Sequence, residues 1–494
     1  MVAIGIATRG RLAADHVAVA CFEDEATPPE HLPAKLAEAV SAIATRPGWR
    51  GRDGQTGELQ IPSPSPDRDQ VVSLWGLGRR DRLERSRLCD WLDGVASRAR
   101  TNGARRVAVV LPDHPEVRDA ATARHLSRDL LLSEYRFDRF RQGSDVAQPK
   151  LGKVLLLPPP GGDALYRSQL PRSRATATAV ARARDLANAP PNEATPRWLA
   201  ERAAELAAGH GFRHSRLDVP DLEARRMGGI LAVGRGSRQP PCLLRLERGD
   251  RGPIVALVGK GVTFDSGGLS IKSARGMVSM KYDKAGACTV LAAALAAAEL
   301  DLPIRLRVYL PLAENMVGGD SFRPGDVIRC FNGRTVEIVN TDAEGRLLLA
   351  DAMAWAVDEG AEHLVELSTL TGGVVAALGY FGAALFTPDE TLAAGLLAAA
   401  EEAGEKLWRM PLWPEFSATV RGNHADLKNS AGRPASAATA AAFLASFVGG
   451  LKSWAHLDIA GTAQVAGNGP ASGFGTALLV DWLHRLAEDG EPAC

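Results

Sequence analysis

Residues 253–272 read PIVALVGKGVTFDSGGLSIK, and this stretch decides how the chain folds. Its first half is a continuous apolar run from Ile254 to Val258, which has the length and composition of a strand buried on both faces. Its second half is a glycine-rich loop that holds Lys260, Asp265 and Lys272. In an open α/β sheet, ligands bind beyond the carboxyl ends of the strands. We therefore expect a functional site directly after this strand.

The segments that follow extend the α/β pattern. An alanine- and leucine-rich stretch predicts a helix over residues 285–300, and an apolar run predicts a strand over 304–312. Strand, helix and strand in this order imply a parallel sheet. Further along, the patterns predict a hairpin, a helix and a strand, over residues 326–339, 347–356 and 363–367.

The N-terminal part of the chain has the same rhythm and predicts a domain of its own. Short apolar runs over 71–75 and 107–111 predict strands, whereas segment 51–69, rich in Gly, Pro, Ser and charge, predicts an exposed loop or a flexible insertion. The run 154–157 ends in Pro158-Pro159-Pro160-Gly161-Gly162, a stop followed by a linker. We therefore expect two domains: a smaller N-terminal α/β domain (1–165), and a larger C-terminal domain (166–494) with a mainly parallel sheet flanked by helices.

Composition and charge exclude several classes of protein. Of the 494 residues, 46% are hydrophobic and 23% are charged, as in globular proteins. The 58 basic and 58 acidic residues balance, which argues against a chain that mainly coats nucleic acid or a membrane. Without a leader or a long apolar span, a cytoplasmic protein with no membrane partner is expected. The six cysteines form no CxxC pair, so we expect neither a disulfide framework nor a structural zinc site.

Charged residues gather at the predicted carboxyl edge of the C-terminal sheet. They are four carboxylates and three cations: Asp265, Asp283, Asp342 and Glu344, with Lys260, Lys272 and Arg346.

Simpler interpretations exist for several of these residues. The glycine-rich loop lacks the GxxxxGK[ST] spacing of a phosphate-binding loop. Asp283 taken alone is better explained as the N-cap of the following helix. Thr341 and Glu344 fit a capping box at the start of another helix. Capping leaves Asp342 without an explanation.

Four carboxylates at one edge repel one another strongly unless cations lie between them. Oxygen-rich ligation suits zinc, manganese or magnesium, and two ions ~3.5 to 4 Å apart would share carboxylates and a bridging water. A lysine can join such a site only as a neutral amine, which arginine cannot become. Only ten of the 58 basic residues are lysine, yet four of them lie between residues 260 and 284.

These residues resemble the signature stretches of the leucyl (cytosol) aminopeptidase family of two-metal exopeptidases. The resemblance covers roughly residues 170 to 490 and is weak before residue 165. The stretches that carry it most specifically are Lys260–Lys272, Met280–Asp283 and Asn340–Arg346. Further similarity lies in residues 232–237, 367–372 and 454–462, and in the N-terminal part only in 75–78 and 135–138.

The resemblance implies a metal-dependent aminopeptidase, active as a homohexamer, that removes leucine-like residues from peptides with a free N-terminus. It implies that a metal-bridging water attacks the scissile bond, with Lys272 and Arg346 as the catalytic pair and a bicarbonate ion held by Arg346 as proton shuttle. The implied ligands of two divalent ions, manganese or zinc with magnesium possible, are Lys260, Asp265, Asp283, Asp342 and Glu344, of which Asp265 and Glu344 bridge. The implied substrate-binding residues are Met280, Thr369, Leu370, Gly372 and Ala471.

Two departures from the family pattern bear on activity and specificity. Lys284 follows the third implied ligand where the family usually has methionine, so it either weakens metal binding or points away along the helix. Residues 472–475 replace a stretch where the family commonly has arginine and proline.

Alternative functions come from other features of the chain. Residues 79–106 hold nine arginines and four acidic residues, which makes a DNA-binding regulator the alternative to an enzyme, although no interleaved aromatic residues support nucleic-acid binding. An inactive scaffold on the same fold would need lost ligands, and all the implied positions are present. His456 and Asp458 alternate along a strand-like run, which indicates buried structural hydrogen bonds.

Overall fold

The computed structural model describes residues 1–7, 12–23, 29, 32–62, 69–142 and 150–489. The chain divides into two compact units, Met1–Thr178 and Ala179–Cys494. Helix α4 (Asp163–Asn188) runs through the point of division. Among the described residues, no helix is both long and apolar enough to cross a membrane.

The N-terminal unit is built on one six-stranded sheet with the strand order β1-β6-β5-β2-β4-β3. All neighbouring pairs are parallel except β3 and β4. The strands are β1 (Ala3–Ile6), β2 (His16–Cys21), β3 (Thr56–Ile61), β4 (Gln70–Gly76), β5 (Arg106–Val110) and β6 (Lys153–Leu157). The helices that pack on this sheet are α1 (Ala34–Ala44), α2 (Arg85–Thr101) and α3 (Ala120–Leu132).

Strand alternation gives this sheet two hydrophobic cores. Along β2, Val17 and Val19 face the core that contains α1, whereas Ala18 and Ala20 face the core that contains α2 and α3. Both faces of a parallel strand are thus buried, as the continuous apolar runs predict.

The prediction of a loop over residues 51–69 is wrong in part, because strand β3 lies within it. This strand pairs antiparallel with β4 at the edge of the sheet, and none of its residues is fully buried. An edge strand with one exposed side has too few apolar residues to give the periodic signal of a buried strand.

The C-terminal unit contains a nine-stranded mixed sheet with a parallel centre, and this confirms the α/β fold class. Its strand order is β16-β15-β18-β14-β9-β11-β8-β7, with β10 paired to β11. The central strands β18, β14, β9 and β11 are parallel to one another, whereas β18 pairs antiparallel with β15 and β11 pairs antiparallel with β8. The bounds are β7 (Arg213–Leu217), β8 (Cys242–Arg248), β9 (Ile254–Gly259), β10 (Gly261–Asp265), β11 (Arg305–Asn315), β14 (His363–Ser368), β15 (Ala383–Phe386), β16 (Leu407–Arg409) and β18 (Trp454–Asp458).

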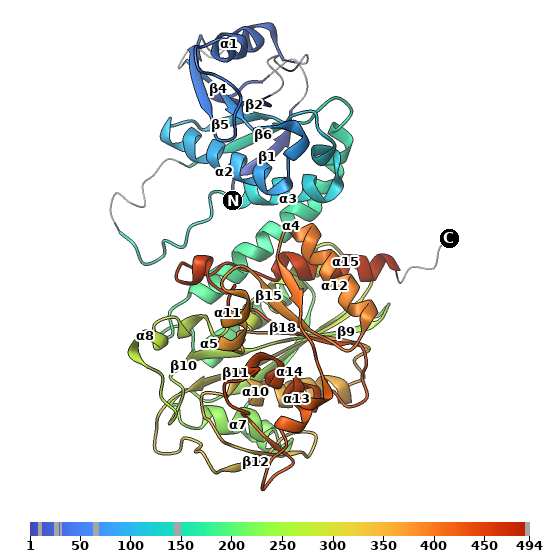
Figure 1. The fold of residues 1–494 in the computed structure, drawn as a ribbon. Helices are drawn as coiled ribbons and strands as arrows, with labels where there is room; N and C mark the ends of the chain where they lie inside the picture. Colours follow the sequence, from blue (N-terminus) through green and yellow to red (C-terminus); the bar gives the residue numbers. More distant parts are fainter. Residues whose placement is uncertain (8–11, 24–28, 30–31, 63–68, 143–149, 490–494) are drawn as a thin grey trace. The chain divides into compact units, whose positions relative to one another are not determined.

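Helices cover both faces of this sheet. Figure 1 shows α12 and α15 on one side and α7, α10, α13 and α14 on the other. Helix α9 packs against β9 and α15, and every residue of it except the last is buried. The helices are α5 (Pro196–Ala208), α6 (Val219–Ala224), α7 (Gly228–Gly234), α8 (Ala274–Met277), α9 (Ala285–Glu299), α10 (Gly345–Asp358), α11 (Gly372–Leu378), α12 (Glu390–Ala403), α13 (Pro414–Thr419), α14 (Ser436–Ala445) and α15 (Thr476–Asp489).

The predicted hairpin forms part of a small separate sheet. Strands β12 (Val327–Arg329) and β13 (Thr335–Glu337) pair antiparallel, and β17 (Leu427–Lys428) adds a third, parallel strand.

The arginine-rich segment forms helix α2 and its approach, and several of its cations form ion pairs. Arg87 lies 2.7 Å from an Asp53 carboxylate oxygen, and Arg98 lies 2.7 Å from one of Glu58. Arg100 similarly pairs with Glu134 at 2.9 Å. These ion pairs reduce the uncompensated positive charge that a polyanion could bind.

Lys284 is completely buried and points away from Asp283, to the end of α4. Its Nζ donates hydrogen bonds to the carbonyl oxygens of Ala187 at 3.1 Å and Ala189 at 3.0 Å, and also to that of Lys281. The end of a helix leaves carbonyl groups without intrahelical partners, and a lysine can satisfy them. Lys284 therefore has a structural role in joining α9 to α4.

Replacement of Lys284 should test that role. We expect Lys284→Met to lower the free energy of unfolding by about 2 kcal/mol, because buried carbonyl groups lose their donor. Lys281→Met is the control, because it removes a lysine of the same segment whose Nζ lies over the Tyr282 ring, 4.9 Å from the ring centre. Urea unfolding of both variants measures the difference, and equal losses would contradict this assignment.

His16 should make the N-terminal unit sensitive to acid. Its Nε2 lies 2.7 Å from Ser73 Oγ, and burial lowers the pKa of this histidine to about 4. Between pH 6.5 and 4 the unfolded chain binds a proton that the folded chain does not, so stability falls as the pH falls. We expect wild type to lose about 3 kcal/mol more than His16→Gln over this range. If the unfolding free energies of wild type and His16→Gln fall equally as the pH is lowered, the prediction is wrong.

Candidate functional site

The charged residues expected at the sheet edge do lie at the carboxyl ends of the central strands. Lys260 directly follows β9, Asp265 ends β10, and Asp283 lies just before α9. Asp342 and Glu344 lie in the turn that leads into α10. Two sheet connections and two helix starts thus converge at one place, as the topology of an open α/β sheet requires.

Two lysines divide the carboxylates between them. Lys260 Nζ lies 2.8 Å from Asp283 Oδ1 and 2.9 Å from Glu344 Oε1. Lys272 Nζ lies 2.8 Å from Asp265 Oδ2 and also pairs with Asp342. These contacts form one continuous cluster of alternating charge.

Three of the carboxylates are close enough to share a cation. Oxygen atoms of Asp265, Asp342 and Glu344 all lie within 4.8 Å of one another. Asp283 Oδ2 is buried and has no hydrogen-bond partner among the described residues, although its Oδ1 accepts from Lys260 and from Thr369 Oγ1. A buried carboxylate oxygen without a partner is costly, and a metal ion would satisfy it. The donor set therefore fits hard or borderline divalent ions.

The capping interpretations of Asp283 and Glu344 are wrong. The N-cap of α9 is Lys284, and the Asp283 carboxylate instead contacts Lys260 and Thr369. Glu344 occupies the N-cap position of α10 but makes no side-chain capping bond. Thr341 Oγ1 bonds to Gly267 O and Ser270 N rather than to the helix. Both carboxylates are thus turned into the cluster.

Close packing at the cluster depends on Gly345. A Cβ atom at this position would lie 2.3 Å from Lys260 Cε and 2.7 Å from Lys260 Nζ. Any side chain here would displace the lysine from Asp283 and Glu344.

Asn315 is a supporting residue that the sequence analysis missed. Its Nδ2 donates to Asp265 Oδ1 at 2.8 Å and to Thr341 O at 3.0 Å, and the residue is fully buried. Gly267 N also donates to Asp265 Oδ1, at 2.8 Å. The signal was present, since a polar amide ends the apolar strand β11 at the same sheet edge.

Burial and mutual repulsion shift the titration of the carboxylates. Burial and the charges of Glu344 and Asp283 raise the pKa of Asp265 to about 8. Burial also raises the pKa of Asp283 to about 6, although Lys260 opposes this. Burial alone would lower the pKa of Lys260, but Asp283, Glu344 and Asp265 raise it overall. The two lysines therefore do not fully offset the negative charge of the carboxylates.

Arg346 lies in the first turn of α10 and is almost entirely buried. Its guanidinium carbon lies 5.9 Å from the centre of the Phe443 ring, and its Nε has no hydrogen-bond partner among the described groups. Burial lowers the pKa of Arg346 to about 10, against the attraction of Glu344 and Asp458. It is not part of the wall of the adjacent cavity.

The cluster opens into a cavity of about 560 Å³. Four of the five residues expected to bind substrate line it, namely Met280, Thr369, Leu370 and Gly372. Ala471 does not line it: this residue is buried, bridges to Gln464 and donates a hydrogen bond from its backbone N–H to Asn188 Oδ1. Tyr282, Tyr380 and Gln464 also line the cavity, and the sequence analysis did not identify them.

His456 and Asp458 form the buried hydrogen bonds expected of them. The His456 ring pairs with Glu366, and both side chains are fully buried. Asp458 accepts from Thr371 Oγ1 at 2.6 Å and from the backbone N–H of Leu370 at 3.2 Å. These bonds fix the loop that forms one wall of the cavity.

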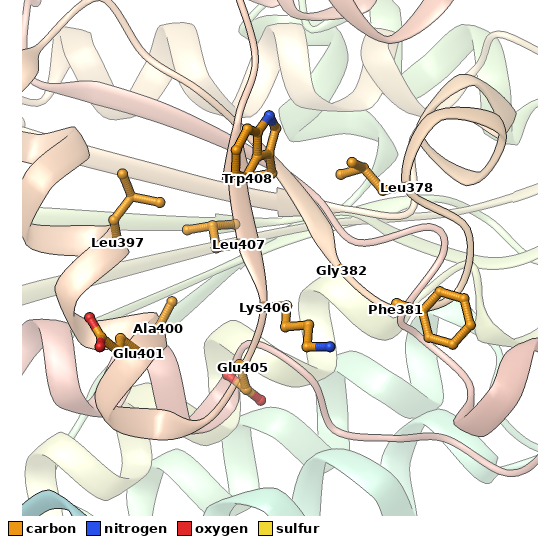
Figure 2. A pocket seen from close by; sticks show the side chains of 10 residues that line it. All are labelled: Leu378, Phe381, Gly382, Leu397, Ala400, Glu401, Glu405, Lys406, Leu407 and Trp408. Atoms are coloured by element: carbon orange, nitrogen blue, oxygen red, sulfur yellow. The ribbon is translucent and has the colours of Figure 1, made fainter. Parts of the chain in front are cut away.

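A second cavity of about 560 Å³ lies near β16 and has a different chemical character. Its lining is mostly apolar, with Leu378, Leu397 and Trp408 around it (Figure 2). Of its charged groups, Glu405 accepts hydrogen bonds from the backbone N–H groups of Gly475 and Leu478 at the start of α15. Its lining lacks the cluster of carboxylates found at the first cavity.

Comparison with protein families matches both units. Residues 181–480 match the model of the cytosol aminopeptidase family, catalytic domain, and residues 18–144 match that of its N-terminal domain.

Individual relatives match over most of the chain. A probable cytosol aminopeptidase of Roseiflexus castenholzii is 39% identical over 92% of this chain and 94% of its own. A second, of Nitrosospira multiformis, is 39% identical over 90% of this chain and 87% of its own.

Solved structures also resemble this chain. The bottromycin maturation enzyme BotP in complex with Mn has a TM-score of 0.81 and 35% identity, covering 96% of this chain and all (100%) of its own. A mutant of tomato leucine aminopeptidase has a TM-score of 0.85 and 31% identity, and the match covers 98% of this chain and 97% of its own. The resemblance noted in the sequence is thereby confirmed, and the chain belongs to the cytosol aminopeptidase family and is a metallo-aminopeptidase.

Proposed function

We propose that the chain removes single N-terminal residues from peptides at a centre of two divalent metal ions, located in the first cavity. One observation carries this proposal: four buried or half-buried carboxylates and two lysines converge at the end of a parallel sheet, beside a cavity large enough for a side chain.

The metal ligands would be the five residues named from the family pattern. Their donors are four carboxylates and one amine: Asp265, Asp283, Asp342, Glu344 and Lys260. Asp265 and Glu344 would be the shared ligands, as the family resemblance implies, and the carboxylate oxygens of both lie within 4.8 Å of each other and of an Asp342 oxygen. When bound, two such ions polarise the scissile carbonyl and activate a water for attack.

The chain's own residues supply orientation and charge stabilisation. Lys272, less buried than Lys260, would stabilise negative charge that develops on the carbonyl oxygen. Arg346 would hold a bicarbonate ion that carries the proton, because its guanidinium is a cation with a donor left free. Met280, Thr369, Leu370 and Gly372 would surround the first side chain, and the apolar members favour leucine-like residues.

The remaining features of the proposal rest on the relatives. The structural neighbour in complex with Mn supports manganese, while zinc and magnesium share the ligand preferences of the site. We propose a cytoplasmic homohexamer that acts on free peptides, as the family resemblance implies. The ion-paired arginines of α2 give no support to a DNA-binding role.

Chelation should abolish the activity, and metal should restore it. We expect hydrolysis of leucine p-nitroanilide to disappear after chelation and to return with manganese, zinc or magnesium, which ranks the ions. N-acetyl-leucine p-nitroanilide should not be cleaved, because its amine is blocked. Activity that survives chelation, or equal cleavage of the acetylated substrate, would contradict a metal-dependent exopeptidase.

Removal of single side chains should separate binding from catalysis. Asp283→Ala is expected to lower activity at least about 100-fold through loss of metal. Lys272→Met should lower kcat by about 100-fold with little change in metal content. Asp250→Ala is the matched control, because the Asp250 side chain is 94% exposed. Normal metal content with normal kcat in either site variant would rule out the proposed roles.

A further inference from the structure

A second group of metal-binding side chains lies in the N-terminal unit, outside the aminopeptidase site. Cys89 on α2 faces His125 and Asp129 on α3, and the two helices pack together. The sulfur, a ring nitrogen and a carboxylate oxygen of these residues lie within 4.8 Å of one another. His125 and Asp129 are four residues apart, so they share one face of α3.

The potential metal-binding atoms of His125 and Asp129 face one another. His125 Nε2 lies 3.0 Å from Asp129 Oδ2, and the His125 side chain is only 11% exposed. The other ring nitrogen, Nδ1, is buried without a hydrogen-bond partner among the described groups. Arg128 contacts the other Asp129 oxygen, Oδ1, at 2.9 Å. Such a contact orients a ligand carboxylate from outside the site.

The thiol of Cys89 is unsuited to act as a nucleophile. Burial, and then the Asp129 charge, raise the pKa of Cys89 well above its ordinary value, so the sulfur is protonated at neutral pH. A divalent cation reverses this preference, because it binds the thiolate and releases the proton to solvent.

We propose that Cys89, His125 and Asp129 bind a zinc ion in the N-terminal unit, with water as the fourth ligand. Thiolate, imidazole and carboxylate are the three donor types that zinc uses in proteins, and the tetrahedral geometry needs them clustered on one side. The ligands come from two helices, which explains why the sequence shows no CxxC pair. The ion would fasten α2 to α3, and its binding converts the Cys89 thiol to a thiolate with loss of one proton.

Cobalt is the probe that separates this site from the aminopeptidase centre. The proposed aminopeptidase ligands are oxygen and nitrogen donors, so a strong sulfur-to-cobalt charge-transfer band in the near ultraviolet must come from a cysteine site and not from that centre. Cobalt added to the full-length, metal-depleted protein should give this band, saturating at one equivalent of thiolate-bound cobalt per chain. One equivalent of zinc at this site should remove it.

Variants decide whether the band belongs to this cluster. It should vanish in Cys89→Ser and persist in Cys21→Ser, the control that replaces another half-buried cysteine of the same unit. His125→Ala should weaken cobalt binding at least about tenfold. Circular dichroism verifies that each variant is folded. Absence of the band in folded wild type, or its persistence in Cys89→Ser, would overturn the proposal.

Discussion

The mutual repulsion of four carboxylates at one edge of the C-terminal sheet is the constraint on which the site depends. Burial raises the pKa of Asp265 and Asp283 to about 8 and about 6, so their charge is costly without nearby cations. Lys260 and Lys272 each lie between two of the carboxylates. The family's metal chemistry uses the same concentration of negative charge, because divalent ions relieve it more completely than two ammonium groups.

The fold holds these charges together through its parallel centre. Strands β9, β11 and β14 end side by side, and their connections bring each carboxylate to the same edge. Local details then fix the atoms: Gly345 leaves space for Lys260, and Asn315 orients Asp265. Asp458 holds the opposite loop through Thr371 and Leu370. The buried Lys284 belongs to this framework, since it ties the start of α9 to the end of α4.

Strong periodic patterns made the C-terminal sheet, its helices and the location of the charged cluster predictable from sequence. Patterns of single residues were less informative. Asp283 and Glu344 looked like helix caps because capping and metal binding use the same residue types, and only the tertiary contacts distinguish them. Strand β3 was missed because an exposed edge strand lacks apolar alternation. The direction of Lys284 depends on carbonyl groups almost a hundred residues away in the chain, which no local pattern reveals.

Electron paramagnetic resonance of the manganese-loaded protein reports whether two ions share bridging ligands at this sheet edge. We expect an exchange-coupled spectrum from two Mn²⁺ ions in wild type, since ions ~3.5 to 4 Å apart with common carboxylates are coupled. Glu344→Ala should lose the coupling and give the six-line signal of isolated ions. Isolated signals in wild type, or coupling that survives Glu344→Ala, would contradict a carboxylate-bridged pair of metal ions at this sheet edge.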